Sequence, residues 1–328
     1  MPTVLIGSEP IRRQGGPFRS LLEGAGFTVV DPAVDGKLAA ADLLRWLAPC
    51  DAVIAGGEAY TAEVIAACPG LRAIARTGVG YDDVDVLAAT ARGVAVTITP
   101  GANHEAVAEH TFALLLALAK DVLVQDRAIR SGAWDRKRLP LPLRGSTLGL
   151  VGLGRIGRAV ATRAVAFGMR VVAYDPTEDP ELDARLGIIR RPFVDLLGSA
   201  DVVSLHLPLT DATRGIFDHR AFALMRPGAL LINTSRGGLI VEADLVAALR
   251  SGHLAGAGLD VFAAEPPPAD HPFWSLPNVA PTPHLAGIDT LAMRDMAEMA
   301  AQALVDLHQG RWPGAAIVNP AVAPGWLW

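Results

Sequence analysis

An arginine ends an apolar run of strand character in the stretch LLINTSRGGLI, residues 230–240. Because a guanidinium keeps its charge and is costly to bury alone, Arg236 at the mouth of a sheet needs an anion to meet it. A planar guanidinium can hold a carboxylate through two hydrogen bonds and also donate to a neighbouring carbonyl oxygen. The pattern therefore predicts that Arg236 binds a substrate of the 2-oxo acid type.

Acid–base residues follow in GLDVFAAEP, which contains Glu265, and in PTPHLAG, which contains His284. Reduction of a ketone by hydride requires a proton for the developing alkoxide, and histidine titrates in the right range to donate it. A carboxylate bonded to the imidazole would raise its pKa and keep it protonated. Taken singly, such residues more often form structural pairs. Their joint placement with Arg236 favours a catalytic role instead.

A glycine-rich turn lies between the apolar run 148–153 and the helical stretch 156–167. In G-x-G-x-x-G the first glycine permits a tight turn, the second lets a pyrophosphate approach the backbone, and the third lets helix and strand pack closely. The helix N-terminus stabilises the phosphate charge, so we expect a dinucleotide here. The expected cofactor contacts on this turn are Gly152, Gly154, Arg155, Ile156 and Gly157.

Asp175 ends the next strand-like run, VVAY, 18 residues after Gly157. This is close to the spacing of about 20 residues expected for the acid that binds the ribose hydroxyls. A carboxylate there repels a 2′-phosphate, and no arginine follows at Pro176 or Thr177, so NAD is favoured over NADP. The alternative is that the glycines form only a tight turn and that Asp175 is a solvated loop residue. The strand, the helix and the acid occur together at the expected spacing, which favours the dinucleotide site.

The elements that position these residues form two series of short strand-like runs alternating with helical stretches, one over residues 3–75 and one from residue 148. This βαβ pattern is typical of parallel sheets, so we expect an α/β protein with two of them. A long helix is predicted over 104–131, with a hinge at 99–101 before it, and another over 290–309. The apolar surface of the first helix is broad enough for a subunit contact.

Composition fits a compact two-domain protein: 328 residues, 51% hydrophobic and 19% charged. The net charge is -5, with acidic and basic residues interspersed, which favours neither nucleic acid nor a membrane surface as partner. We expect a cytoplasmic protein whose Cys50 and Cys68 are buried. His104 and His110 lie about 240° apart around a helix and cannot share a metal, so no metal is predicted.

Four motifs in this order, GLGRIG, NTSRGG, GLDVFAAEP and TPHLAG, resemble those of the D-isomer-specific 2-hydroxyacid dehydrogenase family, over essentially the whole chain. The resemblance implies that Arg236 binds and polarises the substrate, that His284 is the general acid/base, and that Glu265 is its partner. Asp260 would hold the nicotinamide carboxamide. Pro208 and Thr213 complete the cofactor contacts that we assign.

The fold implied by the resemblance is a Rossmann cofactor domain inserted into a flavodoxin-like substrate domain, both doubly wound on parallel sheets. The substrate-binding domain would be discontinuous, comprising residues 1–99 and 288–328. The NAD-binding domain would comprise residues 100–287. The helical region 104–131 at its start would make a homodimer.

The stretch ARTGVGYDDVD, residues 75–85, resembles the substrate loop of the family. The amides of Val79 and Gly80 could hold a carboxylate in a nest. Arg76 stands where the 3-phosphoglycerate dehydrogenase-like subgroup carries a phosphate-binding arginine. The family usually has asparagine where this chain has Asp83, and a carboxylate there would oppose an anionic substrate. Three further basic residues either face the substrate or are solvated at the surface: Arg136, Lys137 and Arg138.

The sequence therefore predicts an NAD-dependent dehydrogenase of 3-phosphoglycerate, without the C-terminal regulatory domain of many such enzymes. Glyoxylate, hydroxypyruvate or another 2-oxo acid is the alternative substrate. An NAD-sensing binding protein of the corepressor type is an alternative of another class. A hydrolase that uses NAD transiently would need a different set of polar residues at the strand ends.

Overall fold

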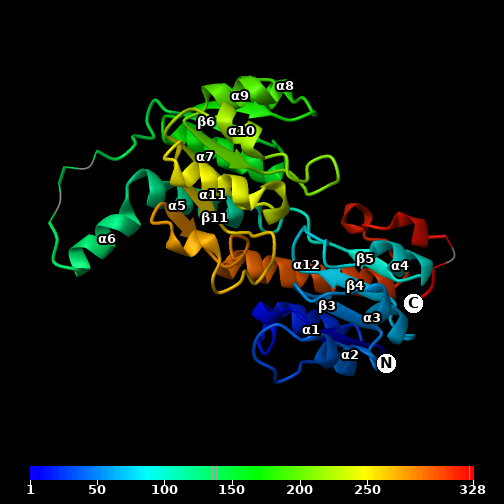
Figure 1. The fold of residues 1–328 in the computed structure, drawn as a ribbon. Helices are drawn as coiled ribbons and strands as arrows, with labels where there is room; N and C mark the ends of the chain where they lie inside the picture. Colours follow the sequence, from blue (N-terminus) through cyan, green and yellow to red (C-terminus); the bar gives the residue numbers. More distant parts are fainter. Residues whose placement is uncertain (135, 138, 325) are drawn as a thin grey trace. The chain divides into compact units, whose positions relative to one another are not determined.

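The computed structural model describes residues 1–134, 136–137, 139–324 and 326–328. The chain divides into two compact units. The first comprises Met1–Asn103 and Gly287–Trp328, and the second comprises His104–Ala286. The chain thus leaves the first unit once and returns to it once (Figure 1).

The first unit is built on a five-stranded parallel sheet with the order β2-β1-β3-β4-β5. This is the strand order of flavodoxin-like folds. Its strands β3 and β4 are buried throughout and consist of small or β-branched residues apart from Arg76, as in a sheet covered on both faces. The strands are β1 Thr3–Ile6, β2 Thr28–Val30, β3 Ala52–Ala55, β4 Ala73–Arg76 and β5 Ala95–Thr97.

Helices connect and cover these strands. Three of them begin at residues whose side chains accept a hydrogen bond from the first turn: Thr61, Asp85 and Asp289. The last helix, α12, packs against α1, β3 and β4, so the C-terminal segment completes the core of this unit (Figure 1). The helices are α1 Pro17–Gly24, α2 Ala40–Leu47, α3 Ala62–Ala67, α4 Val86–Ala91 and α12 Thr290–His308.

The second unit is built on a seven-stranded parallel sheet with the order β12-β11-β10-β9-β6-β7-β8. Counted from β6, this is the Rossmann order 3-2-1-4-5-6 with one strand added at the edge. The prediction of two doubly wound parallel sheets is confirmed. The strands are β6 Thr147–Val151, β7 Arg170–Tyr174, β8 Ile189–Arg190, β9 Val202–Leu205, β10 Ala229–Asn233, β11 Leu254–Leu259 and β12 Val279–Pro281.

One strand of this sheet was missed in the sequence. β8 is only two residues long and lies at the edge, where Ile189 is half exposed, so it leaves no apolar run to recognise. Arg236 therefore follows the fifth strand of this sheet in chain order. Without β8, the strand before Arg236 would be counted as the fourth.

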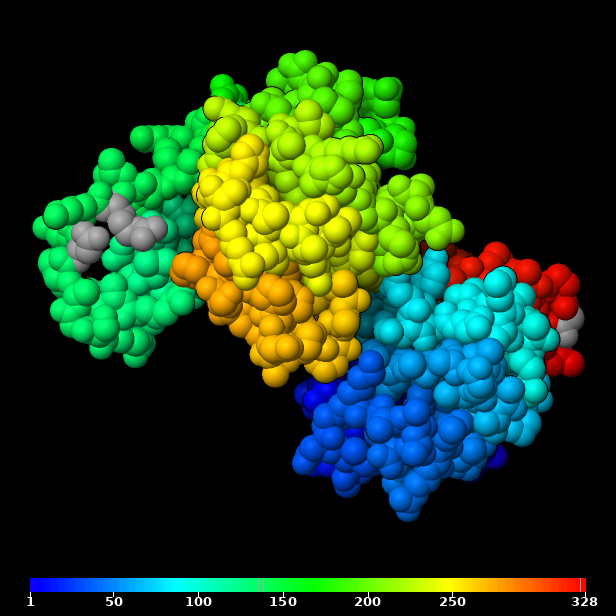
Figure 2. All heavy atoms as spheres, viewed as in Figure 1, coloured from blue at the N-terminus to red at the C-terminus, as the bar shows by residue number. Residues whose placement is uncertain are grey.

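Seven α-helices of the second unit fall within the described residues: α5 His104–Ala119, α6 Val122–Arg130, α7 Arg155–Ala166, α8 Pro180–Leu186, α9 Phe193–Ser199, α10 His219–Leu224 and α11 Glu242–Arg250. The single helix expected over 104–131 was wrong. Asp121 adopts a left-handed backbone conformation with φ 54° and separates α5 from α6. α5 packs on β10 and β11, whereas α6 extends away from the sheet of its unit (Figures 1 and 2).

Candidate active site

The turn between β6 and α7 is shaped by its glycines. Gly152 has φ 103°, and a Cβ on it would lie 2.5 Å from the carbonyl oxygen of His206. A Cβ on Gly157 would lie 2.3 Å from the carbonyl oxygen of Gly152. At Gly154, by contrast, a Cβ would meet no atom of the described residues within 4 Å. The first and third glycines thus allow close packing, and the second leaves the backbone open to a ligand.

The N-terminus of α7 faces this opening, since Gly154 is the N-cap and Arg155 the first helical residue. Glycine has no side chain to accept from the first amides, so the amides of the first turn keep their capacity to bind an anion. A helix of 12 residues adds the favourable field of its dipole. These features fit the pyrophosphate of a dinucleotide.

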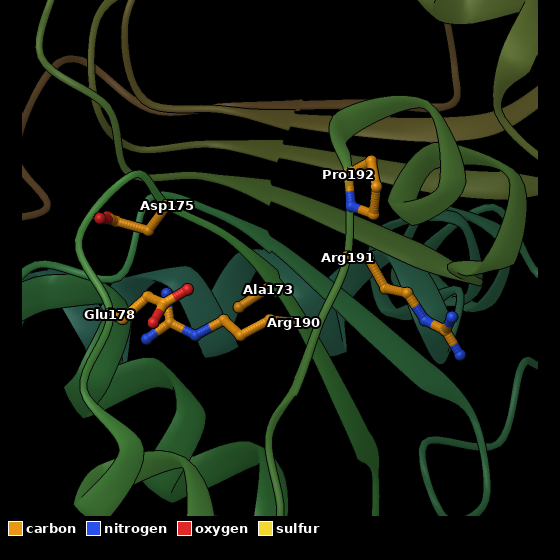
Figure 3. A pocket seen from close by; sticks show the side chains of 6 residues that line it. All are labelled: Ala173, Asp175, Glu178, Arg190, Arg191 and Pro192. Atoms are coloured by element: carbon orange, nitrogen blue, oxygen red, sulfur yellow. The ribbon is translucent and has the colours of Figure 1, made fainter.

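Asp175 lies directly after β7, beside the glycine-rich turn. Its carboxylate accepts hydrogen bonds from the amides of Leu153 and Thr177, each at 2.7 Å, which fixes its position. It lines a pocket of about 210 Å³ (Figure 3). The pocket residues are Ala173, Asp175, Glu178, Arg190, Arg191 and Pro192.

Two arginines in this pocket were missed in the sequence. Only Pro176 and Thr177 had been considered as positions for a cation near the ribose, whereas β8 brings Arg190 and Arg191 there from farther along the chain. Recognising β8 as a strand beside β7 would have predicted this placement.

The loop after β9 carries two further residues assigned to the cofactor. The hydroxyl of Thr213 donates to the carbonyl oxygen of Pro208 at 2.7 Å. The amide of Thr210 donates back to the same hydroxyl at 2.8 Å. These bonds fold the loop onto itself, and its contact with the cofactor stays a prediction.

Arg236 follows the carboxyl end of β10. Its backbone is held by the side-chain amide of Asn233, which donates to the Arg236 carbonyl oxygen at 2.9 Å. Its guanidinium donates to the carbonyl oxygen of Ser235 at 2.7 Å. The next residue must be glycine, because a Cβ on Gly237 would lie 1.9 Å from the carbonyl carbon of Phe262. This contact brings the loop that carries Glu265 against the end of β10.

The structure joins His284 to Glu265, with 2.6 Å between Nδ1 and Oε2. The other carboxylate oxygen of Glu265 accepts from the amide of Phe262 at 2.9 Å. The hydrogen bond from Glu265 raises the pKa of His284, against the opposing effects of burial and of the Arg236 charge. Burial raises the pKa of Glu265, but its bond to His284 and the charges of His284 and Arg236 together lower it. The pair therefore favours a protonated imidazole beside an ionised carboxylate.

The backbone of His284 is strained, because it adopts φ 54°, a region that residues other than glycine rarely occupy. Asp260 holds it there. The Asp260 carbonyl oxygen accepts from the His284 amide at 2.8 Å. The fully buried Asp260 carboxylate accepts from the amides of Leu285 and Ala286 and from the hydroxyl of Thr282. Asp260 thus positions the histidine loop, while its contact with the nicotinamide stays a prediction.

A second histidine contributes to this support. The Nε2 atom of His110, on α5, lies 2.9 Å from the hydroxyl of Thr282 and 3.6 Å from Oδ1 of Asp260. The sequence carried no local signal of this contact, which joins residues 172 positions apart. His206 lies elsewhere in this unit: its Nε2 atom is 2.9 Å from the hydroxyl of Ser204, and burial lowers its pKa to about 3.

The predicted substrate loop lies in the first unit. Arg76 is buried, and its Nε donates to the carbonyl oxygen of Gly80 at 3.0 Å. Its Nη2 lies 3.9 Å from Asp83, and its Nη1 finds no partner among the described residues. Asp83 therefore points toward Arg76 and offsets part of its charge. The roles of Arg76, Val79 and Gly80 stay predictions, and Arg138, one of the three further basic residues, lies outside the described residues.

Among the residues that the structure describes, there is no group of three or more histidine, cysteine or acidic side chains that could hold a metal ion. Within the same residues, no helix combines the length and the apolar character needed to cross a membrane.

The fold and the glycine-rich turn define a dinucleotide-binding protein, with a bonded histidine and glutamate and an arginine near the carboxyl edge of its Rossmann sheet. Residues 112–286 match the model of the D-isomer specific 2-hydroxyacid dehydrogenase, NAD binding domain. The chain belongs to the D-isomer specific 2-hydroxyacid dehydrogenase family, and this part of it is an NAD-binding domain.

Individual relatives cover different shares of the chain. It is 46% identical to the D-3-phosphoglycerate dehydrogenase of Mycobacterium leprae over 81% of its own length but only 51% of that protein. It is 43% identical to the glyoxylate reductase of Korarchaeum cryptofilum over 80% of its length and 81% of that protein. The crystal structure of the TT0316 protein from Thermus thermophilus is similar over 97% of this chain and 100% of that one, with 41% identity and a TM-score of 0.87.

Proposed function

We propose that the protein is an NAD-dependent D-2-hydroxyacid dehydrogenase, which interconverts a small 2-oxo acid and its 2-hydroxy acid. The observation that carries the proposal is the 2.6 Å contact between His284 and Glu265, with the charge of Arg236 acting on both. Such a pair suits proton transfer to and from a substrate whose carboxylate is held by a guanidinium.

The residues divide the reaction between them. NADH, when bound at the glycine-rich turn, supplies the hydride. His284 uses Nδ1 to bond Glu265, which leaves Nε2 to donate a proton to the developing alkoxide of the substrate. Glu265 keeps the imidazole protonated for reduction, and Arg236 binds the carboxylate and polarises the carbonyl group. In the reverse direction the neutral imidazole accepts the hydroxyl proton.

We propose 3-phosphoglycerate and phosphohydroxypyruvate as the substrate pair. The identity to the M. leprae dehydrogenase and the position of Arg76 support this choice. Glyoxylate or hydroxypyruvate is the second candidate, and two observations favour it. Asp83 and the Gly80 carbonyl oxygen already engage Arg76, and the similarity to the glyoxylate reductase covers about four fifths of both chains. A cytoplasmic location stays a prediction.

The test is an NADH-oxidation screen over phosphohydroxypyruvate, hydroxypyruvate, glyoxylate, pyruvate and bulkier 2-oxo acids. We expect Arg236→Ala to lower kcat/KM on the order of 10²-fold or more, the scale of losing one preorganised donor. Arg220→Ala removes an exposed arginine of α10 and should leave the rate unchanged. NADH binding without oxidation of any 2-oxo acid would instead favour the corepressor-type alternative, and a fully active Arg236→Ala would refute the role of this residue.

We further propose that the protein is a homodimer formed through the 104–131 region. α6, each residue of which the structure describes, has no buried residue, and Val122, Leu123 and Ile129 are all more than two fifths exposed. Trp134, just beyond it, is 80% exposed. A second copy of the chain would cover this apolar surface.

A further inference from the structure

Arg190, on the edge strand β8, is tied to an acid from the neighbouring helix. Its Nε donates to Oδ2 of Asp183 at 2.8 Å and its Nη2 donates to Oδ1 at 3.1 Å. Its Nη1 donates to the carbonyl oxygen of Thr177 at 3.0 Å. Both side chains are largely shielded, with exposed fractions of 23% and 16%. The guanidinium is thus held by two parallel bonds, and the Asp183 carboxylate offsets its charge.

This ion pair stands beside the position expected for the adenosine ribose of a dinucleotide. Arg190 lines the same pocket as Asp175 and Glu178, and its bond to Thr177 holds the segment that follows Asp175. Figure 3 shows Arg190 pointing toward Glu178, whereas Arg191 points the other way. A 2′-phosphate on the ribose would be repelled by the carboxylates of Asp175 and Glu178. The guanidinium of Arg190 would not offset this repulsion, because it is bonded to Asp183.

We propose that Asp183 is a specificity-determining residue that favours NAD(H) over NADP(H) by withholding Arg190 from a 2′-phosphate. Repulsion by Asp175 then acts without compensation from Arg190. The inference rests on the proposed NAD(H) function and adds a residue that does not itself touch the cofactor. It follows that removing the charge of Asp183 releases a guanidinium at the site where NADP(H) carries its additional phosphate.

The test is equilibrium binding of NADH and NADPH to the full-length protein, followed by the fluorescence of the reduced nicotinamide. In Asp183→Asn we expect the Kd for NADPH to fall about tenfold, the scale of one charge-assisted hydrogen bond, with the Kd for NADH changed less than about twofold. Glu181→Gln removes the same charge from an exposed position of the same helix and should change neither Kd. Adding Arg190→Gln to Asp183→Asn should abolish the gain.

Arg190→Gln alone provides a second test that does not depend on the folding of Asp183→Asn. Because the native Arg190 is withheld, this variant should bind NADPH as weakly as the native protein. A tenfold weakening would show that Arg190 already binds the 2′-phosphate and would overturn the inference. It would also be overturned if Asp183→Asn, folded and binding NADH normally, showed no gain for NADPH. If the native protein failed to bind NADH, the proposed function itself would be refuted. That result differs from the two results above, in which NADH binds normally and only the role of Asp183 fails.

Discussion

At the scale of single residues, the pair of Glu265 and His284 predicts how activity depends on pH. Its hydrogen bond raises the pKa of His284, so in Glu265→Gln that pKa should fall. Reduction needs the protonated imidazole, and its kcat/KM should therefore decline at lower pH than in the native protein. Oxidation needs the neutral imidazole and should extend to lower pH. The measurement is kcat/KM against pH in both directions.

Glu181→Gln serves as the control for the loss of a carboxylate, since Glu181 is exposed on α8. Its profiles should coincide with those of the native protein. Native pH profiles in Glu265→Gln, in both directions, would contradict the role assigned to the pair.

Several residues of the candidate site could be proposed from the sequence because their spacing carries a mechanism. The glycine-rich turn and Asp175 stand in register with the strand and helix around them, and Arg236, Glu265 and His284 each follow a strand-like run. The support given by His110 and Thr282 was not predictable. It depends on contacts between residues far apart in the chain, which composition and periodicity do not report.

At the scale of elements, the close approach of β10 and the loop at Phe262 predicts the effect of a single methyl group. Gly237→Ala would place its Cβ 1.9 Å from the Phe262 carbonyl carbon, so the two segments must separate. We expect a loss of about 1–3 kcal/mol in the free energy of unfolding, typical of overpacking, and a lower kcat/KM because Arg236 and Glu265 lie on the displaced segments. Denaturant unfolding and steady-state kinetics measure both.

Gly238→Ala is the matched control for this prediction. A Cβ there would lie 2.9 Å from Cδ2 of Leu209, the end of a flexible side chain that can move. We expect a smaller loss of stability and nearly native activity. Equal effects of the two substitutions would argue against a special contact at Gly237.

Elements with strong patterns were predicted well, and those with weak patterns were not. The helix expected over 290–309 is α12, which spans Thr290–His308. Its apolar positions and its capping residue Asp289 both indicate the same helix. The break between α5 and α6 escaped prediction because Asp121 is compatible with either a helix or a left-handed turn. β8 is defined by pairing with β7 rather than by its own two residues.

At the scale of the whole molecule, the exposed apolar face of α6 predicts how the oligomer can be disrupted. Leu123→Glu combined with Ile129→Glu should convert the proposed dimer to a monomer, since two charges in the interface would be desolvated. Light scattering coupled to size-exclusion chromatography measures the mass. Arg220→Glu, at an exposed position of α10 outside this region, is a control for a changed charge and should leave the mass unchanged. A native protein that is monomeric would refute the dimer itself.

The return of the chain to its first unit has a consequence for the order of folding during synthesis. β5 is completed from residues more than 200 positions later: the Asn319 side chain accepts from the Val96 amide at 2.8 Å, and Trp326 donates to the Gly93 carbonyl oxygen at 2.8 Å. The polypeptide emerging from the ribosome can therefore finish residues 104–286 while residues 1–103 still await their last layer. We expect a released polypeptide that ends at residue 286 to resist protease in the second unit and to be cleaved in the first.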